Sequence, residues 1–313
     1  MEKGTVKFVH FMYVPFCGLG NYGGWRGEKW FANRLKIFCQ FVIPSLLAQT
    51  SKDFTVLISF LPEQKNHKLV KDLKKYLDEV GLKSCFLFNG ILFFDDKYPD
   101  EIAKERLINS LHYSMSSLYD EIGEAEYVYF TIQPSDDIFD RHAIEPLQWM
   151  FKHEPQWQAI GFKKGYICNY LTGELAEYNP LTNPPFATIK FTREQFTNPL
   201  EHLKFTSMKR DNGKYKVGTP LPSHEYYEDV FLDRYTAIDE RGFLVGVSGF
   251  NISTNWNIPY KGEAVSREIL KDFGIYDVLP VKLRVPLRKR ILFSLPYRWQ
   301  RKVRYWVTEK FRK

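Results

Sequence analysis

The sequence is poor in the residue patterns that build cysteine-based metal sites. Its four cysteines, Cys17, Cys39, Cys85 and Cys168, stand singly, and none belongs to a Cys-x-x-Cys pair. This spacing argues against a cysteine zinc site and is typical of a protein kept in a reducing compartment.

Long apolar runs are also missing. No stretch reaches the roughly 20 residues needed to cross a bilayer, and the best candidate, 37–48, is interrupted by Gln40, Pro44 and Ser45. The N-terminus lacks a clean signal peptide, because His10 and Tyr13 interrupt its short apolar run. We therefore expect a cytoplasmic protein with no transmembrane helix.

One common phosphate-binding loop is absent as well. GxxxxGK[ST] does not occur, whereas the glycine-rich stretch 15–27 contains one GxGxxG spacing, Gly18–Gly23, a pattern of low specificity on its own. The net charge of +7 is concentrated in 282–313, which holds 12 Lys/Arg and one acid, so the rest of the chain is net negative. This distribution does not imply that the body of the protein binds nucleic acid.

Hydrophobic periodicity predicts that strands alternate with helices over the first 140 residues. We expect strands at 6–14, 54–60, 85–88 and 127–132, and helices at 28–43, 64–80, 100–119 and 141–151. Short strands and turns should follow over 158–222, then a helix at 226–239 and a strand at 243–247. Such alternation predicts a parallel sheet covered by helices on both faces, with ligands at the carboxyl edge of its strands.

An acidic pair, Asp136-Asp137, directly follows the strand predicted at 127–132. Adjacent carboxylates repel each other unless a cation or hydrogen-bond donors compensate, so a divalent metal that bridges to a diphosphate is one interpretation. A helix N-cap, in which Asp accepts backbone N–H bonds, is the other. The spacing alone leaves both open.

A second acidic pair, Glu228-Asp229, could hold a general base for an acceptor hydroxyl, or could be the solvated first turn of a helix. Spacing alone favours the helical turn. His224 could be a metal ligand or a loop residue. Asn251 and Trp256 lie in a polar stretch that could line the acceptor side or form a turn.

Several segments of the chain carry a family resemblance. They are Trp30–Phe38, Pro44–Thr50 with Asp53-Phe54 after it, Ser135–Asp137, Glu228–Arg234 and Ser248–Trp256. In this order they resemble inverting glycosyltransferases of the GT-A type, in particular the rhamnosyltransferase group. The third stands where those families place a DxD-type metal motif, and the fourth resembles their ED-x-x-L-x-x-R segment. The resemblance covers residues 5–258.

The resemblance implies a GT-A fold: Rossmann-like, with a mostly parallel central sheet and flanking helices. It implies a hexosyltransferase of class EC 2.4 that moves a sugar, with rhamnose as the candidate, from a nucleotide-diphosphate donor to a glycan or lipid-linked acceptor. Mg²⁺ or Mn²⁺ would assist. We assign donor binding to Arg26, Arg34, Arg106, Ser135 and Asp136, the metal to Asp136, Asp137 and His224, catalysis to Asp229 with Glu228, and the acceptor side to Asn251 and Trp256.

Three departures from the family pattern favour a second interpretation. Pro134 stands where the motif commonly begins with Asp, the end of the second strand is neutral at 58–61, and Ser248 replaces a common His. The alternative is therefore a non-catalytic carbohydrate- or lipid-binding protein on a decayed GT-A frame. A nucleotidyltransferase also pairs acids with an α/β fold, but its glycine-rich basic signature is not reproduced at 15–30.

The C-terminal segment reads as a separate unit. We divide the chain into a GT-A domain at 1–265 and a basic amphipathic helical tail at 266–313. In the tail, Trp299, Val303, Trp306 and Phe311 share one helical face that basic residues border. Such a face suits an in-plane helix on anionic lipid, at the cytoplasmic side of the membrane, or a helix packed on the body with solvated charges.

Overall fold

The computed structural model describes residues 7–16, 28–88, 101–181, 186–206, 208–209, 215–216, 226–248, 251, 258, 260–276, 281, 283 and 299. The first four strands are β1 (Phe8–Pro15), β2 (Thr55–Ser59), β3 (Ser84–Leu87) and β4 (Tyr127–Ile132). They are parallel to one another: β1 pairs with β2 and β4, and β2 pairs with β3. All four lie where the periodicity predicts them.

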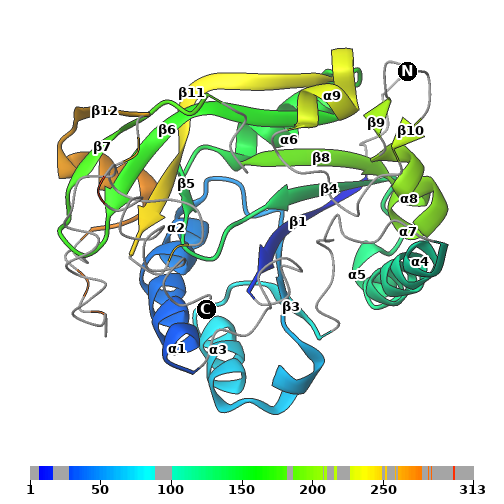
Figure 1. Ribbon diagram of the computed structural model, residues 1–313, viewed down its shortest axis with the longest axis horizontal. Coiled ribbons are helices and arrows are strands. Elements are labelled where there is room, and N and C mark those ends of the chain that lie inside the picture. Colours follow the sequence, from blue (N-terminus) through cyan, green and yellow to red (C-terminus); the bar gives the residue numbers. More distant parts are fainter. Residues whose placement is uncertain are drawn as a thin grey trace.

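The second half of the sheet is mixed. Its strands are β5 (Ile138–Phe139), β6 (Ala159–Asn169), β7 (Leu175–Tyr178), β8 (Ala187–Thr192), β11 (Tyr235–Val247) and β12 (Lys261–Ala264). The order across the sheet is β12-β7-β6-β8-β4-β1-β2-β3, and β11 pairs with both β5 and β6 (Figure 1). A separate antiparallel pair joins β9 (Met208–Lys209) to β10 (Tyr215–Lys216).

Helices cover both faces of the sheet, because alternate residues of each strand point to opposite sides. On β1, Met12 and Val14 join one core cluster, while Phe11 and Tyr13 join the other. The first cluster includes side chains of α1 (Glu28–Ile37), α2 (Ile43–Ala48), α3 (Lys68–Glu79) and α6 (Ile144–His153). The second includes side chains of α4 (Glu101–Ser116), α5 (Tyr119–Ile122), α7 (Arg193–Thr197), α8 (Pro199–Phe205) and α9 (Tyr227–Phe231).

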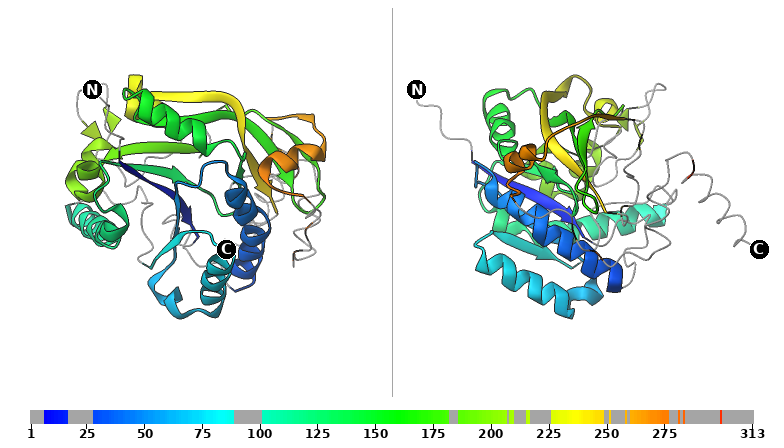
Figure 2. Two further views of the ribbon diagram at one scale, coloured as in Figure 1. Left: turned by 180° about the vertical axis from the view of Figure 1, so that it is seen from behind. Right: turned by 90° about the vertical axis from the view of Figure 1, so that its left-hand side faces the viewer.

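These layers confirm the predicted α/β class, with a central sheet and flanking helices (Figures 1 and 2). The starts of α1 and α3 lie side by side, joined by a hydrogen bond of 3.1 Å between Glu28 Oε2 and His67 Nε2. Within the part of the chain that the structure describes, no helix has both the length and the apolar character to cross a membrane.

The helix predicted at 28–43 is longer than expected and changes pitch in the middle. Between α1 and α2 the chain forms a π-helical segment, Phe38–Val42, and the Ile43 N–H bonds back to the Phe38 carbonyl. Pro44, which has no N–H to donate, is accommodated directly after this wider turn. Pro44 therefore does not end the helix, which continues to Ala48.

The helix predicted at 226–239 is wrong. Only α9 and a 3₁₀ turn, Leu232–Arg234, precede β11, which begins at Tyr235. From there the chain pairs in parallel with β6 along its length, in a register from Tyr235↔Ala159 to Val247↔Asn169. The expectation of only short strands within 158–222 is also wrong, because β6 has 11 residues. Long-range pairing between these two strands overrides the local helical pattern.

Residues beyond the predicted boundary at 265/266 contribute to the main core. A 3₁₀ helix, Arg267–Phe273, buries Leu270 and Phe273 there, and Val281 and Leu283 are buried in the same cluster. The edge of this core therefore does not coincide with 265/266, and the division into two domains stays a prediction. Apart from Trp299, residues 284–313 lie outside the described part of the chain.

A buried network of polar side chains is centred on His10 of β1. His10 Nδ1 accepts from Gln148 Nε2 at 3.0 Å, so His10 Nε2 carries the proton and donates to Thr131 Oγ1 at 2.7 Å. Thr131 Oγ1 in turn lies 2.5 Å from Thr188 Oγ1. Burial lowers the pKa of His10 to about 3, which keeps the imidazole neutral in the folded protein.

The network predicts loss of stability in acid. The unfolded chain takes up a proton at His10 below about pH 6.5, whereas the folded protein does so only near pH 3. Within this window the free energy of unfolding should fall by about 1.4 kcal/mol per pH unit through this residue. Urea unfolding of wild type and His10→Gln between pH 7 and 4.5 measures it. Equal slopes in the two proteins would contradict the assignment.

Candidate functional site

The acidic pair lies at the carboxyl edge of the parallel strands, as the sequence predicts. After β4 the chain makes a short turn at Ser135-Asp136 and enters β5 at Ile138. Ser135, Asp136 and Asp137 are each only 8% exposed. Since a strand and not a helix follows the pair, the helix N-cap interpretation is wrong.

Asp136 is held by two side chains from distant parts of the sequence. Arg34 of α1 forms an ion pair with Oδ2 of Asp136 through Nη1. Asn251 donates to the same oxygen from Nδ2 at 2.8 Å. The structure therefore brings together Arg34 and Asp136, both predicted to bind the donor, and Asn251, predicted to lie on the acceptor side.

Asp137 is held by the backbone of β11. Its Oδ1 accepts from the Gly246 N–H at 2.8 Å, while Gln133 Nε2 donates to its carbonyl at 2.7 Å. Burial, and then the negative charge of Asp136, raise the pKa of Asp137 well above its usual range. The Gly246 hydrogen bond and the Arg34 charge oppose this shift. A further positive charge next to Asp137 would offset the remaining free-energy cost of ionising this buried carboxyl group.

A tyrosine that the sequence did not point to, Tyr170, packs against the acidic pair. Tyr170 donates from its hydroxyl to the Asp136 carbonyl at 2.9 Å. Its ring stacks on Phe41 of the π-helical segment, with centroids 3.9 Å apart and planes within 7°. The π turn thus lies directly behind the acidic turn. Only the fold brings these two aromatic side chains together.

The Pro44–Thr50 motif acquires a structural explanation. Ser45 donates from Oγ to the Phe139 carbonyl at 2.8 Å, and Gln49 donates from Nε2 to the Asp140 carbonyl at 2.9 Å. Both side chains are buried. They fix the backbone just after the acidic pair, so this motif of the second helix acts on the site through β5.

Glu228 and Asp229 are exposed on α9 and are not brought to the acidic pair. β11 begins just after α9, and Gly246, which contacts Asp137, lies near the other end of that strand. Arg106 lies on α4. Arg26, His224 and Trp256 lie outside the described residues.

The residues present fit a divalent cation that is shared with a bound diphosphate. Mg²⁺ in proteins is commonly held by one or two carboxylates together with substrate phosphates, and Asp136 and Asp137 supply two buried carboxylates on adjacent residues. Across the described residues no group of three or more His, Cys, Asp or Glu gathers to hold a metal by itself.

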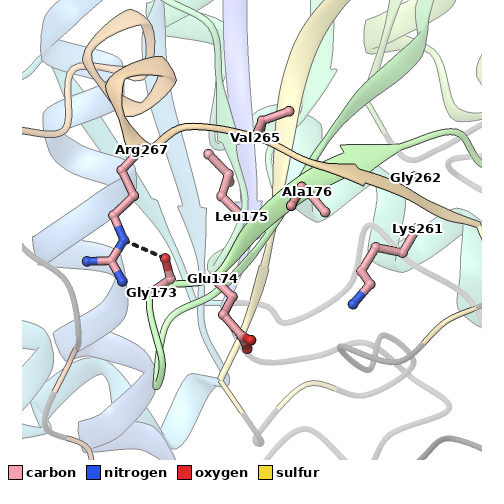
Figure 3. Close-up of a pocket in the computed structure, with 9 residues that line it drawn as sticks. Gly173, Glu174, Leu175, Ala176, Lys261, Gly262, Val265 and Arg267 are labelled. Carbon is pink, nitrogen blue, oxygen red and sulfur yellow. Dashed lines mark hydrogen bonds between the residues drawn. The ribbon is translucent and has the colours of Figure 1, made fainter.

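A separate hollow of about 420 Å³ lies at the edge of the sheet between β7 and β12 (Figure 3). Arg267 closes one end, where its Nε donates to the Gly173 carbonyl at 2.7 Å. Glu174 and Lys261 supply the other charges. Its lining includes none of the residues that hold the acidic pair.

Comparison with known proteins gives likenesses of shape alone. No family model matches the chain, and no curated protein does. Among solved structures, it is similar to S. aureus TarS, with TM-score 0.32 and 14% identity over 78% of this chain and 37% of TarS. It is also similar to apo mouse xyloside xylosyltransferase 1, with TM-score 0.36 and 12% identity over 74% of this chain and 85% of that one. The chain thus spans little more than a third of the length of TarS. Because both TM-scores are this low, the function has to be inferred from the residues of the site.

Proposed function

We propose that the protein is a glycosyltransferase that takes a sugar from a nucleotide-diphosphate donor. The observation that carries the proposal is the buried Arg34–Asp136–Asp137 cluster at the carboxyl edge of the parallel strands. At this edge α/β proteins bind nucleotides. A guanidinium beside paired carboxylates can bind a diphosphate through its own charge and through a shared metal ion.

The chemistry follows from charge. When the sugar leaves, negative charge develops on the diphosphate, and fixed positive groups stabilise it. Arg34 supplies one such group, held on α1 over Trp30 at 5.3 Å from the ring centroid. A bound Mg²⁺ or Mn²⁺ would supply further Lewis-acid stabilisation of the leaving group. Asn251 and Tyr170 keep the Asp136 carboxylate and backbone in place.

The finer specificity rests on the sequence resemblance. It supports rhamnose as the sugar, inversion at the anomeric carbon, and a glycan or lipid-linked acceptor. The second candidate is a non-catalytic carbohydrate- or lipid-binding protein. The pairing of Arg34 with Asp136 favours this candidate to the extent that it leaves the carboxylate less available to a metal.

A thermal-shift screen tests the proposal. The full-length protein is melted with UDP, GDP, dTDP or CDP, each with Mn²⁺ or with EDTA, since a ligand that binds only the folded state raises the melting temperature. We expect one nucleotide to raise it with Mn²⁺ in wild type but not in Asp136→Ala. Asp78→Ala, on the exposed face of α3, is the matched control. No shift with any nucleotide would support the non-catalytic candidate.

Asp229 should be dispensable for donor binding, because α9 and the acidic pair lie toward opposite ends of β11. Asp229→Asn is expected to give the same nucleotide-induced shift as wild type, within about twofold in affinity. Transfer to acceptor, followed as release of nucleoside diphosphate, then tests the role implied by the resemblance. A loss of turnover with donor binding intact supports Asp229 as the base, whereas a loss of donor binding contradicts this placement.

We also propose that the basic tail brings the enzyme to an anionic membrane surface, where a lipid-linked acceptor would lie. Val281 and Leu283 are buried, and the Val281 N–H donates to the Tyr170 carbonyl at 2.7 Å, so a truncation must spare them. We expect the full chain to sediment with vesicles containing anionic lipid, and a chain ending at residue 283 to stay in solution. Equal retention of both chains would refute tail-mediated binding.

A further inference from the structure

Arg34 is a buried cation in direct contact with a carboxylate assigned to a metal. Its side chain is 3% exposed, and its guanidinium lies between the Trp30 ring and Oδ2 of Asp136. Desolvating a guanidinium is costly unless it is paired, so the ion pair with Asp136 compensates its burial. The same contact compensates the burial of Asp136.

Oδ2 of Asp136 has two donors. Besides the Arg34 ion pair it accepts the hydrogen bond from Asn251 Nδ2, which also donates to the Gly246 carbonyl. A divalent cation that approached this oxygen would meet the guanidinium at contact distance, and the two positive charges would repel each other strongly in a buried site. Metal binding at Oδ2 and the Arg34 contact therefore compete.

A diphosphate changes this balance. Guanidinium groups bind phosphate oxygens bidentately, as they bind carboxylates, and a diphosphate carries more negative charge than one carboxylate. A diphosphate within reach would draw the guanidinium from Asp136 and leave that carboxylate in need of a new cation. The divalent ion can then bind Asp136 and the phosphate oxygens together.

We propose that Arg34 is a placeholder cation, which occupies Asp136 while the site is empty and yields it to the metal when a diphosphate binds. This inference rests on the proposed donor site and adds a rule to it: metal and diphosphate bind with positive coupling. Because coupling between two ligands is reciprocal, the metal strengthens diphosphate binding by the same factor. Free Mg²⁺ or Mn²⁺ alone is a poor ligand of the empty protein.

The test measures Mn²⁺ binding to the full chain without any nucleotide, from the electron paramagnetic resonance signal of the free ion. We expect Arg34→Gln to bind Mn²⁺ at least tenfold more tightly than wild type. Arg34→Lys, which keeps a positive charge, should bind it as weakly as wild type. Adding Asp136→Asn to Arg34→Gln should remove the gain. Equal Mn²⁺ affinity in wild type and Arg34→Gln would overturn the proposal.

A second measurement needs no variant and covers the case in which Arg34→Gln does not fold. Wild type is titrated with Mn²⁺ in the presence of inorganic pyrophosphate, with allowance for the complex that the two form in solution. We expect at least tenfold tighter Mn²⁺ binding than to the protein alone, and independent binding would overturn the proposal. If a nucleotide shifts the melting temperature but no coupling is found, only the placeholder role fails. If no nucleotide shifts it, the proposed function fails.

Discussion

Gly246→Ala is expected to destabilise the fold by about 3 kcal/mol and to abolish the proposed nucleotide binding, because overpacking a buried site costs about this much. A Cβ at this position would lie 2.2 Å from the Asp136 carbonyl oxygen and 2.3 Å from the Tyr170 ring. One neighbour is backbone and the other ring is stacked on Phe41, so neither can move aside cheaply. The acidic turn would have to shift.

Urea unfolding and the nucleotide thermal shift check this prediction. Gly262→Ala on the edge strand β12 is the control, since its new Cβ would lie 3.0 Å from Glu177 Cβ and 3.1 Å from Glu177 Oε2, a much looser contact than at Gly246. It should cost less than about 1 kcal/mol and leave nucleotide binding intact. A Gly246→Ala protein with wild-type stability would show that the acidic turn does not pack against this strand as described.

Asp137→Asn should stabilise the protein while removing the metal-dependent nucleotide binding proposed above. The pKa of Asp137 is raised in the folded state, so the folded protein holds a proton that the unfolded chain releases. The free energy of unfolding therefore falls as pH rises from the usual carboxyl pKa, about 3.9, towards the raised value. Asparagine has no such titration, and its Oδ1 can still accept the Gly246 N–H.

The expected gain in the free energy of unfolding is about 1–2 kcal/mol at pH 8, within the range of single stabilising substitutions in other proteins. It should shrink as the pH is lowered towards 5. Melting temperatures of wild type and Asp137→Asn across this range, without metal, measure the difference. A variant that is less stable than wild type at pH 8 would show that the carboxylate contributes more as an acceptor than its burial costs.

The sequence predicted the features that depend on local order. The strand at Tyr127–Ile132 has the predicted bounds, and the acidic pair lies at the edge that parallel alternation implies. Arg34 and Asn251 were predicted as site residues, but the packing of Tyr170, Phe41 and Gly246 around the pair could not be predicted, because it depends on contacts between distant segments. Tyr170 lies 34 positions after Asp136. Phe41, which stacks on Tyr170, lies far before both of them in the chain.

The misassigned helix at 226–239 shows the limit of periodicity. Its second half holds Tyr235, Thr236 and Ile238, which have good strand propensity, but their spacing also fits a helical face. Their partners on β6 are some 76 positions away, as Ile238↔Phe162 illustrates. A pattern read within one short segment carries no information about so distant a partner. Gly246 could not be identified from the sequence for the same reason, because its role depends on the acidic turn and Tyr170, which pack against it.

The acidic turn depends on residues from widely separated segments, among them Arg34, Ser45, Tyr170, Gly246 and Asn251. These residues are spread from position 34 to position 251, so no short segment contains them all. The site therefore cannot form before the sheet is complete from β1 to β11. A fragment that ends before β11 would carry the motif without its contacts. Occupancy of this site by a ligand would therefore report that the whole chain has folded, and it should slow hydrogen exchange in β11 as well as around the acidic pair.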